Sequence, residues 1–198
     1  MLSRSRVRLA EARQRLERHD SLDPLRARLV ELGNREIHLV EWAWRGTLRP
    51  GVRRTAVLIS WLGNGLAYLA LAAVLLLTLD GVAGPLAVSA MCVLVAHLIY
   101  PWTKLACGRQ RPCELRSDLE PRLASLDKHS FPSGHAMTLT AALLPILIAY
   151  PAIWPVAAIA WLLMAWSRVA CAHHYPSDVL AGSALGLVVA APLSWLLV

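Results

Sequence analysis

Long apolar runs separated by short polar segments make up most of the chain. Four of these runs contain no Asp, Glu, Lys or Arg, and they cover Thr55–Leu79, Gly81–Thr103, Ser133–Ser167 and Val179–Val198. A helix needs about 20 apolar residues to cross a bilayer. Each run is therefore long enough, or nearly long enough, to cross a membrane as a helix.

The third run is long enough for two crossings. Tyr150-Pro151 and Pro155 lie near its middle, and proline breaks a helix because it removes a backbone donor and clashes with the preceding turn. The pattern therefore predicts an all-α integral membrane protein with about five transmembrane helices in a bundle. A water-soluble helical protein is the alternative, but these runs carry no polar face that could contact water.

Tryptophan supports the same topology. The chain has eight Trp residues, and those near the ends of predicted spans are Trp61, Trp102, Trp154, Trp166 and Trp195. The amphipathic indole ring prefers the membrane–water interface. A single Trp could equally pack in a core, so the set is more informative than any one member.

The first 54 residues form a basic N-terminal extension that we separate from the membrane domain of residues 55–198. Met1–Arg18 is rich in arginine without a following apolar core, so it is not a secretory signal. Leu29–Trp44 alternates apolar and charged residues. It is too short and too charged to span, and it suits an amphipathic helix in the membrane interface. A solvated surface helix is the alternative.

Charge is distributed unevenly over the predicted topology. All 20 Lys and Arg residues lie in the extension, in the Lys104–Phe131 loop or in the Ser167–Asp178 loop, which five spans place on one face. The positive-inside rule then predicts a multi-pass protein of the cell (inner) membrane with this face in the cytoplasm. The net charge of +7 does not require a nucleic-acid partner, because anionic lipid headgroups attract arginine equally well.

The four cysteines do not define a compartment. Cys92 and Cys171 read as small apolar residues, whereas Cys107 and Cys113 share one loop region. These two could form a disulfide only if the loop faces an oxidising space. We expect free thiols.

The first of three polar segments is Lys104–Pro112. Lys104 and Arg111 are seven residues apart, about two helical turns, which places them on one side if the helix continues. Pro112 would then end that helix. Two cations aimed at one point repel each other unless an anion lies between them, and the planar fork of Arg matches two phosphate oxygens. Cations that snorkel to the membrane border are the alternative.

The second polar segment is Phe131–His135, with the sequence Phe-Pro-Ser-Gly-His. It precedes an uncharged helix, so Ser133 is well placed as the N-cap. A helix N-terminus offers free backbone N–H groups to an anion, and Gly134 removes the side chain that would keep an oxygen away from them. His135 lies in the first turn, within reach of a bound anion.

The third polar segment is Ser167–Asp178. Arg168 would supply a third cation, and Asp178 follows His174 by four residues with Pro176 between them. A carboxylate at that distance can accept the ring N–H of His174, fix its tautomer and leave the other nitrogen as a nucleophile. A helix-start charge is the alternative for Asp178. His173 is interpreted as structural.

Together, these three segments resemble the signature of the type 2 phosphatidic acid phosphatase superfamily, which also contains vanadium haloperoxidases and bacterial acid phosphatases. The resemblance covers Lys104–Asp178, and every signature position is filled. It implies that His174 attacks phosphorus and that Asp178 orients it. It also implies that His135 protonates the leaving oxygen and then activates water. The residues implied to bind the phosphoryl oxygens are Lys104, Arg111, Ser133, Gly134 and Arg168.

The sequence therefore predicts a membrane-embedded lipid phosphatase that needs no cofactor and no metal. Phosphoryl transfer depends on positioning and charge neutralisation, and three cations with a helix N-terminus can supply both. The expected partners are a lipid phosphate substrate and the surrounding membrane lipids. Phosphatidate, phosphatidylglycerophosphate and isoprenyl diphosphate all fit as substrates.

Two other functions are the alternatives. A vanadate-dependent haloperoxidase would use the same anion site, but its known members are soluble. A non-catalytic protein that binds lipid phosphates would usually lack one of the two histidines, and here His135 and His174 are both present. The acidic and basic residues Glu114, Arg116, Asp118 and Glu120 are interpreted as a solvated rim.

Overall fold

The structure is a computed structural model that describes residues 24–125 and 127–198, and within these residues all regular secondary structure is helical. Met1–Arg18 of the sequence analysis lies outside the described residues. The elements in chain order are α2 (Pro24–Gly46), α3 (Pro50–Leu62), α4 (Gly65–Thr78), α5 (Ala83–Cys107), α6 (Pro112–Leu115), α7 (Gly134–Ala149), the 3-10 helix η1 (Pro151–Ile153), α8 (Trp154–Ala170) and α9 (Pro176–Leu197). The predicted all-α class is confirmed.

Three helical segments in the described part of the chain are long and apolar enough to cross a membrane, namely Ala83–Leu115, Pro151–Ala170 and Pro176–Leu197. The predicted break after Tyr150 is confirmed, because α7 ends at Ala149 and η1 separates it from α8. Helix α7 is apolar but has only 16 residues. The predicted number of five spans therefore requires α7 and the α3–α4 pair to cross as well.

The first predicted span, Thr55–Leu79, is not one straight helix. It forms α3 and α4, which meet at an angle of 71° around Gly63 and Asn64. Glycine is a weak helix former, and here it also makes room: a Cβ on residue 63 would lie 2.5 Å from both a ring carbon of His135 and the terminal methyl of Met164. The bend is therefore fixed by close packing on α7 and α8.

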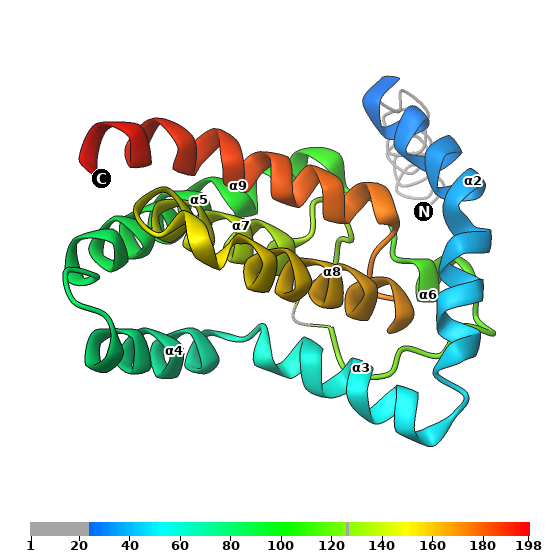
Figure 1. The fold of residues 1–198 in the computed structure, drawn as a ribbon. Coiled ribbons are helices and arrows are strands. Elements are labelled where there is room, and N and C mark those ends of the chain that lie inside the picture. The colour runs from blue at the N-terminus through cyan, green and yellow to red at the C-terminus, as the bar shows by residue number, and fades with distance from the viewer. Residues whose placement is uncertain (1–23, 126) are drawn as a thin grey trace, which may run out of the picture.

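The centre of the bundle is the contact between α7 and α9, with α5 packed against both (Figure 1). Two glycines one turn apart allow the close approach. A Cβ on Gly182 would lie 2.2 Å from the Ser133 carbonyl oxygen, and one on Gly186 would lie 2.6 Å from the Met137 carbonyl oxygen. Small residues spaced in this way let helix backbones approach closely in membranes. The core around them is formed by Val88, Cys92, Ala96, Met137, Ala141, Val189 and Ala190.

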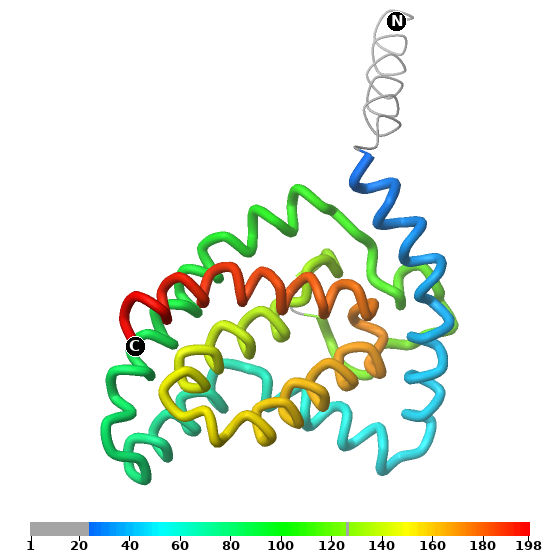
Figure 2. The backbone as a smooth tube through the Cα atoms, turned by 45° about the horizontal axis from the view of Figure 1, so that its top comes forward, coloured from blue at the N-terminus to red at the C-terminus, as the bar shows by residue number. Residues whose placement is uncertain are grey.

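Helix α2 contains the predicted amphipathic segment and lies across one end of the bundle (Figures 1 and 2). Its buried positions recur every three or four residues, at Leu29, Gly33, Ile37, Val40 and Ala43, which is the spacing of one helix face. This face packs against α8, α9 and α6. Apolar side chains also remain on the outside, including Trp42 at 74% exposure. Its place in the membrane interface stays a prediction.

Candidate active site

The three polar segments meet at the end of the bundle that α2 crosses. The first begins in the last turn of α5, the second leads into α7, and the third joins α8 to α9. One cavity of about 1100 Å³ is lined by residues from all three segments, including Arg111, His135, Arg168 and His174. The fold therefore brings together groups that lie far apart in the sequence.

The second and third segments are joined through backbone contacts. The Ser133 N–H donates to the Asp178 carbonyl oxygen at 2.9 Å, and Gly182 lets α9 approach at this point. Ser133 is the N-cap of α7, as predicted, but its hydroxyl makes no capping hydrogen bond. This buried hydroxyl has no hydrogen-bond partner. It is a donor available to an anion at the helix N-terminus.

The first segment differs from the prediction of a continuous helix. Helix α5 ends at Cys107, because Gly108 adopts a left-handed conformation with φ of 60°, and Pro112 starts α6 rather than ending α5. Lys104 and Arg111 nevertheless converge. Their terminal nitrogens each lie 2.6 Å from the same oxygen, Oδ1 of Asp127. A carboxylate therefore bridges the two residues predicted to bind phosphate.

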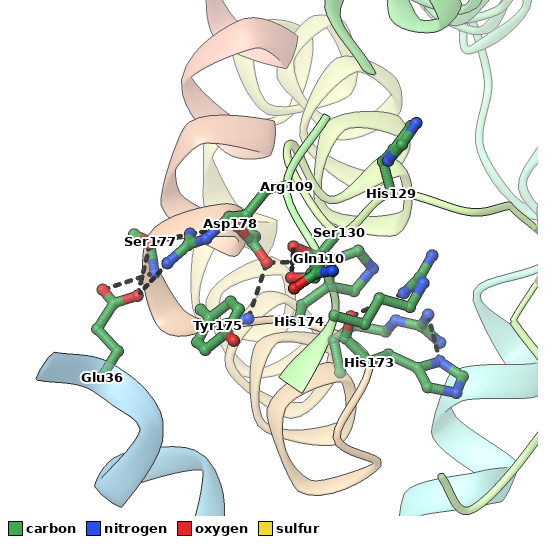
Figure 3. A network of polar contacts seen from close by, with 12 residues as sticks. Glu36, Arg109, Gln110, His129, Ser130, His173, His174, Tyr175, Ser177 and Asp178 are labelled. Carbon is green, nitrogen blue, oxygen red and sulfur yellow. Dashed lines mark hydrogen bonds and ion pairs between the residues drawn. The ribbon is translucent and has the colours of Figure 1, made fainter. Parts of the chain in front are cut away.

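Asp178 is held by a second network (Figure 3). Its Oδ1 accepts a hydrogen bond from Arg109 Nη1 at 2.6 Å, and its Oδ2 accepts one from the Tyr175 N–H at 2.8 Å. The Arg109 guanidinium also stacks over the Tyr175 ring at 4.0 Å and contacts Glu36 Oε2 of α2 at 3.3 Å. Glu36 in turn accepts hydrogen bonds from Ser177.

His174 and Asp178 lie close together, as predicted, but they form no hydrogen bond in this structure. His174 Nδ1 lies 3.6 Å from Asp178 Oδ2 and has no hydrogen-bond partner. Catalytic hydrogen bonds are often long without substrate and tighten when it binds. The arrangement leaves the other ring nitrogen, Nε2, as the candidate nucleophile.

Arg168 is positioned by its neighbours at the end of α8. It donates to the Ser60 hydroxyl and, through Nη2, to His173 Nδ1 at 2.7 Å. His173 Nε2 then donates to the Leu123 carbonyl oxygen at 2.7 Å. The two contacts fix the His173 tautomer, which fits the structural role that the sequence indicated.

His135 lies in the first turn of α7, where the sequence placed it. Its Nε2 is 3.2 Å from the Ser60 carbonyl oxygen, and Gly63 leaves room for the ring. The imidazole lines the same cavity as His174. The α3–α4 bend therefore supports one of the two candidate catalytic histidines.

The electrostatic environment differs between the loops of the site. Burial lowers the pKa of His174 well below its usual value, and the charges of Arg168, Arg111 and Lys104 lower it further. Burial beside Arg168 also lowers the pKa of His173 to about 3. Both imidazoles are therefore neutral near pH 7, and a neutral imidazole has the lone pair that a nucleophile needs.

Asp127 shows the opposite balance. Burial acts to raise its pKa, but the hydrogen bond from Lys104 and the charges of Lys104 and Arg111 outweigh it, so its pKa lies below the usual value. Asp127 is thus a carboxylate at neutral pH. It carries one negative charge into the centre of the predicted phosphate site.

Four residues of the site were missed by sequence reasoning, namely Glu36, Tyr100, Arg109 and Asp127. Arg109 had a visible signal, since it is an additional cation inside the first polar segment. Asp127 lies only six residues before Ser133, yet its loop has no periodicity that would direct its side chain. Glu36 and Tyr100 have no local signal, because their partners are distant in the sequence.

Three further predictions concern the cysteines, metal ions and Glu114. Cys92, Cys107, Cys113 and Cys171 are not joined in disulfide bonds. Within residues 24–125 and 127–198, no three or more His, Cys, Asp and Glu side chains are grouped in a way that could hold a metal ion. Glu114, predicted as part of a solvated rim, is exposed and also accepts a hydrogen bond from the Arg111 N–H at 3.1 Å.

Comparison with known proteins gives concordant results. A relative from Mycobacterium tuberculosis, decaprenylphosphoryl-5-phosphoribose phosphatase, is 34% identical over 144 residues, which cover 72% of this chain and 79% of the relative. The fold is similar to that of a transmembrane PAP2 type phosphatidylglycerolphosphate phosphatase from Bacillus subtilis, with a TM-score of 0.61, 24% identity and coverage of 87% of this chain and 90% of that chain.

The structure of LpxE from Aquifex aeolicus shares the fold as well, with a TM-score of 0.64, 19% identity and coverage of 80% of this chain and 93% of that chain. The family model of the PAP2 superfamily matches residues 82–198, which include all three polar segments. The family predicted from those segments is thus confirmed, and the chain belongs to the PAP2 superfamily.

Proposed function

We propose that this membrane phosphatase hydrolyses a phosphate monoester or diphosphate on a lipid, without a metal ion, through a phosphohistidine at His174. The observation that carries the proposal is the shared cavity of about 1100 Å³. At one place it is lined by His135, His174, Arg111 and Arg168, and elsewhere by apolar side chains of α4, α5 and α7. A phosphate headgroup and an apolar lipid chain would fit these two parts.

The phosphoryl group would bind at the N-terminus of α7. There, the free backbone N–H groups of the first helical turn attract an anion, and the Ser133 hydroxyl is buried without a partner. Lys104, Arg111 and Arg168 would neutralise the phosphoryl charge around this point, and Gly134 keeps a side chain away from it. In a site that excludes water, such preorganised donors stabilise developing charge strongly.

Two steps would complete the reaction. In the first, the His174 Nε2 lone pair forms the N–P bond while the bond from phosphorus to the lipid oxygen breaks, and that oxygen takes a proton from His135. In the second, water gives a proton to His135 and attacks phosphorus, the N–P bond breaks, and inorganic phosphate leaves. Asp178 would accept the His174 Nδ1–H and stabilise the imidazolium that forms.

The apolar part of the cavity supports a lipid substrate. Leucines of α4, α5 and α7 line it, among them Leu69, Leu75, Leu86 and Leu139. Such a wall accepts any hydrocarbon chain, so the headgroup selects the substrate. The relative's name makes decaprenylphosphoryl-5-phosphoribose the first lipid to test, beside phosphatidate, phosphatidylglycerophosphate and isoprenyl diphosphate.

We also propose that the site lies at the cytoplasmic face of the cell membrane. The support is the charge pattern: the segments Lys104–Phe131 and Ser167–Asp178 at this end hold all the Lys and Arg residues outside the N-terminal extension, and α2 of that extension lies at the same end. A cysteine introduced at exposed Ser125 should react with a membrane-impermeant maleimide only after the membrane is opened. Labelling of intact cells would place the site outside.

Phosphate release from the lipid panel tests the function. Full-length protein purified in detergent with excess EDTA should hydrolyse at least one of these lipids, and His174→Ala should abolish release while keeping the wild-type melting temperature. His38→Ala, which removes an exposed imidazole of α2, should leave release unchanged. Loss of activity in EDTA that returns with a divalent metal would contradict metal independence. Absence of release from every lipid would favour the binding protein.

A further inference from the structure

We propose that Asp127 is an internal ligand of the phosphate site that sets its affinity. In the free enzyme, its carboxylate lies where a phosphoryl oxygen would lie between Lys104 and Arg111, and the phosphate of substrate or product binds only by displacing it. The inference deepens the proposed function, because it assumes that these two cations bind the phosphoryl group.

The contacts of Asp127 are those expected of a bound phosphate. Oδ1 accepts from Lys104 Nζ and from Arg111 Nη2, both at 2.6 Å, and Oδ2 accepts from the Tyr100 hydroxyl at 3.0 Å. Charge-assisted hydrogen bonds of this length are the strong kind that also hold phosphate. Two of the proposed phosphate-binding residues, Lys104 and Arg111, are therefore already engaged by one side chain.

The carboxylate also lies in the right place. Asp127 lines the same cavity as His174, Arg168 and Gly134. Tyr100 extends toward the start of α7, where a Cβ on Gly134 would lie 2.6 Å from its hydroxyl oxygen. The Asp127–Tyr100 pair therefore fills part of the space above the helix N-terminus, which is the proposed anion site.

The loop around Asp127 allows displacement without losing its anchor. The Asp127 side chain is 34% exposed, whereas those of Lys104 and Arg111 are 6% and 2% exposed. Separately from the carboxylate, the backbone carbonyl of Asp127 accepts from Arg111 Nε at 3.3 Å and from Nη2 at 3.2 Å. The side chain can therefore turn toward solvent while the backbone contact to Arg111 remains.

An internal competitor weakens the binding of every anion at this place by the same factor. It therefore raises the KM for substrate and, equally, weakens retention of the inorganic phosphate that the reaction releases. It also supplies the negative charge that keeps two buried cations from repelling each other before substrate arrives. If Asp127 instead stayed in place and held the headgroup, its removal would weaken binding.

The test is the affinity of full-length, detergent-purified protein for inorganic phosphate, measured by titration calorimetry for wild type and Asp127→Asn. We expect the Kd of the variant to fall by a factor of about ten or more, because a charge-assisted contact no longer has to be broken. KM for the lipid substrate should fall in parallel, and inhibition by phosphate should tighten. The matched control is Asp118→Asn, whose exposed carboxylate pairs with Arg116 in the same loop and which should leave Kd unchanged.

Folding of the variant is part of the same test. Asp127→Asn should melt at a lower temperature than wild type without phosphate, and added phosphate should raise its melting temperature more than that of wild type. A Kd that is unchanged or higher, or a variant that phosphate does not stabilise, would overturn the proposal. If the variant gives one of these results while the wild type hydrolyses lipid phosphates, the proposed function stands and only the role of Asp127 is rejected. Tighter phosphate binding without any hydrolysis would retain Asp127's role and contradict the proposed function.

Discussion

Two carboxylates neutralise arginines in this site, but they do so in different surroundings. Asp178 is fully buried at the start of α9 and pairs with Arg109, whose side chain is 2% exposed. Asp127 lies in a loop with its side chain 34% exposed and pairs with Lys104 and Arg111. Both pairs have contacts of 2.6 Å, so distance does not distinguish them. The two pairs differ in the exposure of the carboxylate and in whether it lies at the start of a helix or in a loop.

The difference indicates two kinds of task. Removing one partner of a fully buried pair leaves a charge without water or counter-ion, which destabilises the fold strongly. Such a pair suits a group that must stay in place, which is the role we propose for Asp178 in orienting His174. A partly exposed carboxylate can exchange its partners for water, and it suits a place where substrate must enter. Variants at either pair, and at the contacts around them, test this contrast.

Asp178→Asn should have the largest effect on both stability and turnover. It leaves Arg109 buried without its strongest partner, so the free energy of unfolding should fall by about 3–5 kcal/mol. The amide can also hold His174 in the wrong tautomer, and kcat should fall by a factor of about 10²–10⁴. Denaturation in detergent and phosphate release measure the two effects. If Asp127→Asn destabilised the protein as much as Asp178→Asn, the contrast between the two pairs would be wrong.

Gly182→Ala should have the second largest effect on stability and activity, because it acts where α9 packs against the start of α7. Its Cβ would lie 2.2 Å from the Ser133 carbonyl oxygen, so α9 must move away from α7 at a cost of about 1–3 kcal/mol. Activity should fall with stability, since the Ser133–Asp178 backbone contact lies at this point. Gly84→Ala is the control, because a Cβ there meets nothing within 4 Å. Equal melting temperatures for the two variants would argue against close packing at Gly182.

The free energy of unfolding should decrease as the pH is lowered through the acid range. His173 has a pKa of about 3 in the folded protein and an ordinary value of 6.5, so the unfolded chain binds more protons between these values. The contribution of His173 to the free energy of unfolding is therefore fully present above about pH 6.5 and is lost as the pH falls toward 3. His174, with its pKa lowered in the same direction, adds to this dependence.

His173→Gln separates the two histidines. Glutamine can accept from Arg168 and donate to the Leu123 carbonyl, but it does not titrate, so unfolding measured between pH 7 and pH 4 should show a shallower slope. His38→Gln on the exposed side of α2 is the matched control and should keep the wild-type slope. A slope that stays the same in His173→Gln would mean that His173 is not held neutral by its surroundings.

Glu36→Gln should have the smallest effect. Its contact with Arg109 is 3.3 Å long and secondary to Asp178, so the loss of unfolding free energy should be about 1 kcal/mol. We expect kcat to fall less than tenfold with KM unchanged, because Arg109 contacts Asp178 and does not line the cavity in which we propose that the phosphate binds. Glu31→Gln, which removes an exposed pair with Arg35, is the control. A change in KM alone would show that Glu36 acts on substrate binding.

Much of the fold and most residues of the candidate site follow from local sequence signals. Uninterrupted apolar runs identify membrane helices by length, and Pro151 marks the break between α7 and α8 by its lack of a backbone donor. His135, Arg168 and His174 are recognisable because charged and polar groups beside such runs are rare. These signals depend on residue type and spacing, which the chain displays directly.

The remaining features depend on tertiary contacts. Arg109 is separated from Glu36 and Asp178 by 73 and 69 residues, and no pattern in either segment indicates the partner. The bend at Gly63 follows from the position of His135, which belongs to another helix. Asp127 lies in an irregular loop, so its direction depends on Lys104 and Arg111. Gly108 could have been recognised as a helix end, since glycine commonly adopts the left-handed conformation there.

Trapping the phosphoryl group on the protein is the most direct test of whether His174 is the nucleophile. His135→Asn should be incubated with p-nitrophenyl phosphate, whose leaving group needs no proton, so that the first step proceeds while hydrolysis of the intermediate is slow. After an alkaline quench, which preserves phosphohistidine, peptide mass spectrometry should find the phosphoryl group on His174. Turnover by the wild type together with a phosphoryl group on another residue, or with none in the variant, would show that His174 is not the nucleophile.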